Sequence, residues 1–76
     1  MPDHTLDARH LNCPLPILKT KRALDKVEVG ETLTVLATDP GSPDDFIAFA
    51  DSRGHTLIEQ TTSPDGSFRF VLRREN

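Results

Sequence analysis

The chain has 76 residues, with 9 Lys and Arg against 12 Asp and Glu, a formal net charge of −3, and a single cysteine. A chain of this length has room for one domain with a modest core, so we expect a single domain over residues 1–76. One cysteine excludes an intramolecular disulfide and is too few for a cysteine-rich zinc site. The negative net charge argues against a general nucleic-acid-binding protein.

No apolar run approaches the roughly 18 residues that a membrane span requires. Residues 1–4 lack the basic start and the apolar run of a secretion signal. Together with the single cysteine, these features predict a soluble cytoplasmic protein that has no membrane partner. We also expect the protein to be a monomer.

Residues 5–9 alternate apolar and polar side chains, which predicts a half-buried strand. Over residues 14–27 the period changes to that of a helix, with an apolar stripe on one side and a basic ridge on the other. The stripe consists of Ile17, Thr20, Ala23, Leu24 and Val27, and the basic ridge of Lys19, Arg22 and Lys26. Leu18 lies off the stripe and is expected to be exposed near the cysteine, either as a partner contact or without a role.

The middle of the chain predicts a strand followed by a second helix. Residues 32–38 are rich in β-branched side chains, as strands are, and residues 39–41 form a turn. Residues 42–45 have the start signals of a helix, with Ser42 as the N-cap and acidic residues in the first turn. Gly54 is expected to end this helix.

The end of the chain predicts a hairpin, with strands at residues 56–62 and 67–73. The resulting order βαβαββ favours an α/β two-layer sandwich, a mixed four-stranded sheet with two helices on one face. Cys13 would follow the first strand and precede the first helix, at the edge where α/β folds usually bind ligands.

Cys13 is followed directly by Pro14, and Pro16 stands two positions further on. Proline is tolerated in the first turn of a helix, which makes Pro14 the first helical residue and Cys13 the N-cap. Because Pro16 has no N–H, the Leu15 amide is the one local donor for the sulfur. A thiolate at this position also feels the positive end of the helix dipole, so we predict a depressed pKa for Cys13. The alternative is a buried cysteine that packs as a small hydrophobe.

Four stretches of the sequence combine into a more specific pattern. They are Leu6-Asp7-Ala8, Asn12-Cys13-Pro14-Leu15-Pro16, Thr38-Asp39-Pro40-Gly41-Ser42 with Asp45-Phe46, and the C-terminal strand at residues 69–73. In these stretches the chain resembles the small sulfur-carrier proteins of the TusA, or SirA-like, family. The resemblance implies a βαβαββ fold and a persulfide sulfur carried on Cys13, with Pro14, Leu15 and Pro16 as the supporting motif.

The resemblance also implies the partners and the chemistry. Sulfur would come from a cysteine desulfurase or a rhodanese and pass to an acceptor such as a DsrE-like or TusD-like relay protein. The relay would end in tRNA thiolation, sulfur oxidation or cofactor synthesis. No metal, organic cofactor or direct nucleic-acid contact is implied, and the chain would be a sulfurtransferase component rather than a self-sufficient enzyme.

One residue departs from the family pattern, since a glycine usually stands three residues before the cysteine and this chain has His10. Glycine at that position indicates a positive φ, which histidine tolerates less well. The His10 cation could also lie close enough to favour the thiolate, which makes His10 a candidate modulator. The alternative is a solvated turn residue.

The residues by themselves leave three functions open. A covalent sulfur carrier would use Cys13 as the nucleophile and would need no second catalytic group. A small RNA- or protein-binding module would use the basic ridge, although the chain has no Tyr or Trp for base stacking. A thiol redox sensor would commonly need a resolving cysteine, which this chain lacks. With the resemblance we predict the carrier, docking through Leu18, Lys19, Arg22 and Lys26 onto an acidic partner surface.

Overall fold

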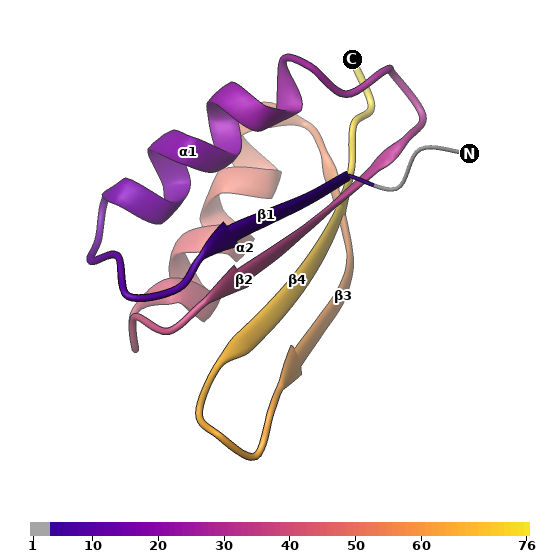
Figure 1. Cartoon of the computed structure of the whole chain (residues 1–76). Coiled ribbons are helices and arrows are strands. Elements are labelled where there is room, and N and C mark those ends of the chain that lie inside the picture. The colour runs from indigo at the N-terminus through magenta and orange to yellow at the C-terminus, as the bar shows by residue number, and fades with distance from the viewer. Residues whose placement is uncertain (1–3) are drawn as a thin grey trace.

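The strands of the described residues form one sheet, and the helices lie on one of its faces (Figure 1). The structure is a computed structural model that describes residues 4–76. In chain order the elements are β1 (His4–Ala8), α1 (Leu15–Leu24), β2 (Thr32–Ala37), α2 (Ser42–Arg53), β3 (Thr56–Thr62) and β4 (Phe68–Arg73). Within residues 4–76, neither helix has the length and apolar character needed to cross a membrane.

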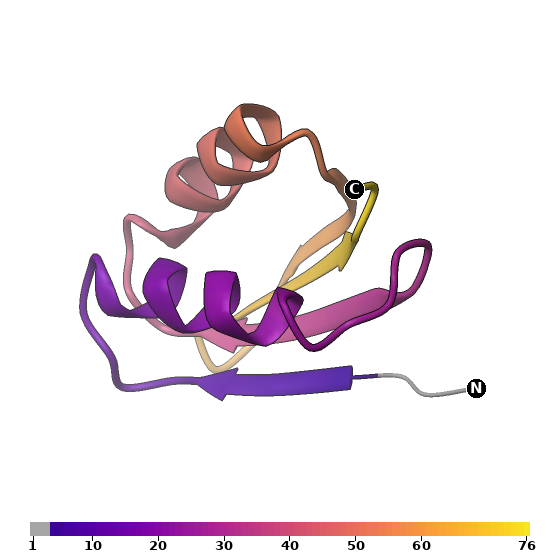
Figure 2. The same ribbon diagram turned by 90° about the horizontal axis from the view of Figure 1, so that it is seen from above.

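The sheet is mixed, with the strand order β1-β2-β4-β3. β1 runs parallel to β2, with Leu6 opposite Val35, and β4 runs antiparallel to both of its neighbours. α1 packs over β1 and β2, whereas α2 packs over β3 and β4 and lies beside α1 (Figure 2). The predicted two-layer α/β sandwich with both helices on one face is therefore confirmed.

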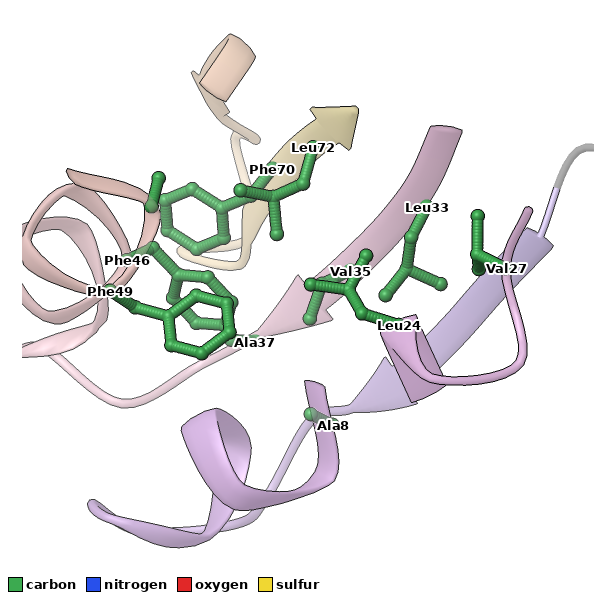
Figure 3. Packing of buried hydrophobic residues seen from close by; sticks show 11 residues of the cluster. Ala8, Leu24, Val27, Leu33, Val35, Ala37, Phe46, Phe49, Phe70 and Leu72 are labelled. Carbon is green, nitrogen blue, oxygen red and sulfur yellow. The ribbon is translucent and has the colours of Figure 1, made fainter. Parts of the chain in front are cut away.

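The core fills the space between the sheet and the helices (Figure 3). Its buried apolar side chains are Ala8, Leu24, Val27, Leu33, Val35, Ala37, Phe46, Phe49, Ala50, Phe70 and Leu72. Phe46 of α2 and Phe70 of β4 are both fully buried, and their rings stack with centroids 4.4 Å apart. Such a pair contributes about 0.5–1.5 kcal/mol beyond its buried area. The stack therefore fixes α2 against the sheet.

The second helix begins one residue earlier than the sequence predicted. Gly41 is the N-cap, with φ −81° and ψ −6°, and Ser42 is already helical. The Asp39 carboxylate accepts the Gly41 N–H at 3.0 Å. Ser42 is buried, and its hydroxyl has no hydrogen-bond partner among residues 4–76. The expectation that Ser42 caps the helix is therefore wrong, whereas Gly54 ends it as predicted, with φ 73°.

The predicted hairpin is confirmed, with β4 beginning at Phe68 rather than one residue before it. The Ser63 N–H donates to the Ser67 carbonyl at 2.8 Å and closes the loop. Gly66 adopts φ 89° in this loop, a conformation that glycine reaches without steric cost. The alternation of β4 is also as expected, since Phe70 is buried toward the helices.

The first helix ends before its apolar stripe does. α1 stops at Leu24, while Val27 is buried in the turn that follows. The Arg74 guanidinium donates through Nη1 to the carbonyls of Leu24 at 3.0 Å and Val27 at 2.7 Å. The last carbonyls of a helix lack intrahelical amide partners, so a cation at this end both satisfies them and suits the helix dipole. The C-terminal tail thus caps α1.

Replacing Arg74 with alanine should lower the free energy of unfolding by about 1.5–3 kcal/mol, because the charged hydrogen bonds to the end of α1 are lost. Urea denaturation followed by circular dichroism measures this loss. Arg73→Ala is the matched control, since Arg73 is exposed and contacts Glu75 at the surface. Equal losses in the two variants would contradict the capping role of Arg74.

Candidate functional site

Cys13 lies in the turn between β1 and α1, and it is exposed. The Cys13–Pro14 peptide bond is cis, and Pro14, with φ −98° and ψ 14°, is the N-cap of α1. The Leu15 N–H donates to the Asn12 carbonyl at 2.8 Å. The predictions that Cys13 is the N-cap and that its sulfur lies over the Leu15 amide are therefore wrong, because a backbone turn already uses that amide.

The residues of the supporting motif take different positions around the thiol. Pro16 is buried against the core, and its carbonyl accepts the Thr20 hydroxyl at 2.8 Å. Pro14 and Leu15 are exposed, and the Pro14 carbonyl accepts the Leu18 N–H at 3.1 Å, which is the first turn of the helix. One proline thus anchors the turn in the core while its neighbours leave the thiol accessible.

The second helix contributes a carboxylate to the site. The pKa of the Cys13 thiol is raised above its ordinary value. The largest cause is a hydrogen bond with Asp45, and partial desolvation and the negative charges of Asp45 and Asp39 add to it. The depressed pKa expected from the helix dipole is therefore wrong. The dipole belongs to the helix that follows Cys13, whereas these carboxylates come from α2 and from the turn before it.

A shallow groove extends from the thiol between the two helices. Its lining residues are Cys13, Pro14, Ile17, Asp45, Ala48, Phe49, Ser52 and Arg53. Most of the lining near the thiol is apolar, and Asp45 and Arg53 provide the charges. The sequence pattern predicted Asp45 as an acidic residue in the first turn of a helix. Its position directly before Phe46 was the available signal, because a buried Phe46 turns Asp45 toward the flank of α2.

His10 adopts φ 68°, the left-handed conformation that the family glycine indicated. Its N–H donates to the Thr38 hydroxyl at 2.8 Å and ties the turn after β1 to the end of β2. The pKa of Asp7 is lowered to about 2 by its hydrogen bonds with Arg9, and the His10 charge adds a smaller effect. The charges that act on the thiol come from Asp45 and Asp39. A role for His10 as a modulator of Cys13 stays a prediction.

The basic ridge and the thiol groove lie on different flanks of α1. Lys19, Arg22 and Lys26 are exposed and line a second groove, between α1 and β1, whose floor includes Leu6 and Ala23. Cys13 lines the groove toward α2. Leu18 belongs to the same helix, is 50% exposed and lines neither groove. The structure therefore brings the three cations together but separates them from the groove that contains the thiol.

Within residues 4–76, no three His, Cys, Asp or Glu side chains gather closely enough to hold a metal ion.

The fold and the site define a small α/β domain that presents one exposed thiol between its first strand and its first helix. A family model for sulfurtransferase TusA matches residues 4–74. The sulfur carrier protein TusA of Allochromatium vinosum is 47% identical over 72 residues, which cover 95% of this chain and 93% of that protein. A candidate sulfur carrier protein of Neisseria meningitidis is 47% identical over 75 residues, 99% of this chain and 100% of that protein.

A solved structure supports the same assignment. The SirA-like protein of Desulfitobacterium hafniense superposes with a TM-score of 0.82 at 26% identity, over 95% of this chain and 97% of that one. The chain belongs to the TusA family of sulfurtransferases. The family resemblance predicted from the sequence is confirmed.

Replacing His10 with glycine should raise the free energy of unfolding by about 0.5–1 kcal/mol, because a left-handed non-glycine residue costs more than the added backbone entropy of glycine. Thermal or urea unfolding measures the gain. His10→Ala is the matched control, since it removes the imidazole but keeps the Cβ, and it should bring no gain.

The same variants test the modulator role. If the imidazolium assists the thiolate, both should alkylate more slowly than the original chain below a pH of about 6.5, the reference pKa of histidine. Unchanged rates from about pH 5.5 to 8 would show that His10 acts only through the backbone.

Proposed function

We propose that the protein carries sulfur as a persulfide on Cys13 and passes it from one protein to another. The observation that carries this proposal is the exposure of the single thiol on a turn that Pro16 anchors in the core. A carrier needs one accessible nucleophile held in a fixed position, and it needs no second catalytic group. Membership of the TusA family and the name of the Allochromatium relative support the same role.

The transfer is balanced without an added oxidant or reductant. In loading, the Cys13 thiolate attacks the outer sulfur of a donor persulfide, a new S–S bond forms, and the donor leaves as a thiolate. In discharge, an acceptor thiolate attacks the outer sulfur on Cys13 and the Cys13 thiolate leaves. Each step exchanges one S–S bond for another. The sulfur is cargo, so the proposed chemistry requires neither a metal nor an organic cofactor.

The proposed partners are a cysteine desulfurase or a rhodanese as the donor and a DsrE-like or TusD-like protein as the acceptor. The relay would supply tRNA thiolation, sulfur oxidation or cofactor synthesis. Family membership supports these partners, and the charged surface supports the place of docking. We propose that the acceptor or donor contacts the ridge of Lys19, Arg22 and Lys26 through an acidic patch.

Incubation with a small-molecule persulfide or polysulfide should increase the intact mass by one sulfur atom, and the added sulfur should be removable by a reducing thiol. Cys13→Ser should abolish the gain while keeping the fold, because the side chain is exposed. Intact mass spectrometry and circular dichroism measure both results. A sulfur adduct on Cys13→Ser, or none on the original chain, would overturn the carrier function. A mass gain from peroxide but none from polysulfide would favour the redox sensor.

Reversing Lys19, Arg22 and Lys26 to glutamate should slow protein-to-protein sulfur transfer about tenfold at low salt and flatten its salt dependence. Loading by a small neutral persulfide donor should stay nearly unchanged, because the ridge lines a different groove from the thiol. Reversal of Arg69 and Arg73 on β4 is the control for altered net charge and should have a smaller effect. Equal losses with both kinds of donor would show damage to the thiol site instead.

A further inference from the structure

Two carboxylates lie close together near the thiol, Asp39 in the turn before α2 and Asp45 in the first turn of α2. The Asp39 Oδ2 atom accepts the Gly41 N–H at 3.0 Å. A Cβ atom placed on Gly41 would lie 3.1 Å from Asp39 Oδ2 and 3.6 Å from Asp45 Oδ2, so both carboxylates border the same point. Asp45 also lines the groove that holds Cys13. The absence of a side chain at Gly41 leaves room for this pair.

The acidic pair is not neutralised inside the described part of the protein. The ion pairs among residues 4–76 use other carboxylates, those of Asp7, Glu31, Glu59 and Glu75. Asp39 and Asp45 are therefore left without a cation among these residues. Of the charged groups around the thiol, Arg53 lines the same groove without an ion pair to Asp45, and His10 lies on the preceding turn.

Unpaired carboxylates next to a thiol have a defined chemical effect. Negative charge disfavours the thiolate, and a carboxylate that accepts a hydrogen bond from the S–H group stabilises the neutral thiol. The thiolate is the nucleophile in sulfur exchange, so a protonated thiol reacts slowly. The positive end of α1 acts in the opposite direction, whereas Asp45, which lines the groove with Cys13, and Asp39 both raise the pKa of the thiol.

We propose that Asp45 is a positioning residue that holds the Cys13 thiol in a protonated resting form until a partner protein places a cationic side chain against Asp45 and Asp39. The inference rests on the proposed role of Cys13 as the sulfur carrier. When the cation pairs with the carboxylates, it offsets their negative charge beside the sulfur, and the thiol proton passes to solvent. The resulting thiolate then attacks the outer sulfur of the donor persulfide as described above.

The proposal also predicts where the partner surface carries negative charge and where it carries positive charge. The ridge on the β1 flank of α1 requires negative charge on the partner, whereas the thiol end requires a lysine, arginine or protonated histidine beside the partner's reactive sulfur. A partner with both features can dock in one orientation only, because reversing it would bring like charges together. The same arrangement makes the free carrier less reactive toward oxidants and unrelated disulfides.

Asp45→Asn, with Asp44→Asn as the matched control, tests the resting form. Asp44 is the exposed neighbour in the same turn of α2, and the groove beside the thiol does not include it. Alkylation of Cys13 by iodoacetamide, followed across pH, should be several-fold faster at neutral pH in Asp45→Asn, with its midpoint at lower pH. Asp44→Asn should match the original chain. Equal profiles for all three proteins would overturn the proposal.

Small disulfides of different charge test activation by a cation. The original chain should react faster with dicationic cystamine than with neutral bis(2-hydroxyethyl) disulfide. The ratio of these two rates should be larger for the original chain than for Asp45→Asn. Added salt should reduce that ratio in the original chain, a result that does not depend on whether the variant folds. A ratio that neither salt nor Asp45→Asn alters would overturn the proposal.

Persulfide loading separates this inference from the proposed function. If the original chain and Asp45→Asn both gain one sulfur from polysulfide, with identical disulfide ratios, the carrier function stands and the role of Asp45 fails. If neither protein gains sulfur, the carrier function fails, and the inference that rests on it fails as well.

Discussion

The stacked rings of Phe46 and Phe70 are the contact on which the arrangement of the site depends. Both rings are fully buried, and they join α2 to β4 in the core. Successive helical residues point about 100° apart, so a Phe46 that faces the sheet turns Asp45 to the side of the helix. That side lines the groove with Cys13. Apolar packing thus determines where a negative charge stands relative to the only thiol of the chain.

The site places two electrostatic effects in opposition. The start of α1 favours a thiolate, whereas the Asp45 carboxylate and its neighbour Asp39 disfavour one, and the pKa of the Cys13 thiol is raised. The Asp45 and Asp39 carboxylates each carry a full negative charge, whereas the dipole places only about half a unit of positive charge at the start of a helix. For the proposed carrier, a thiol that is exposed yet protonated combines access for partners with low reactivity in their absence.

Much of the fold followed from local pattern. Alternation with a period of two predicted the first strand, β-branched residues predicted the second, and the apolar stripe predicted which side of α1 is buried, where Thr20 and Leu24 lie. Gly54 predicted the end of α2 because a left-handed residue is needed there. The glycine that the family usually has at this position indicates a positive φ, and His10 keeps that backbone conformation. These features depend on backbone sterics and on burial of one face, which neighbouring residues largely decide.

The sequence by itself thus determined the order of the elements, the layer architecture, the family, and the place of the thiol between the first strand and the first helix. Only the tertiary structure decided the surroundings of that thiol, because its charged neighbours arrive from α2 and from the turn before it. Arg74 likewise caps α1 from the opposite end of the chain. Local periodicity predicts which side of a helix is buried, but it does not predict which residue of another element will lie beside it. The electrostatic effect of one charged group on another depends on the distance between them, which only the tertiary structure sets.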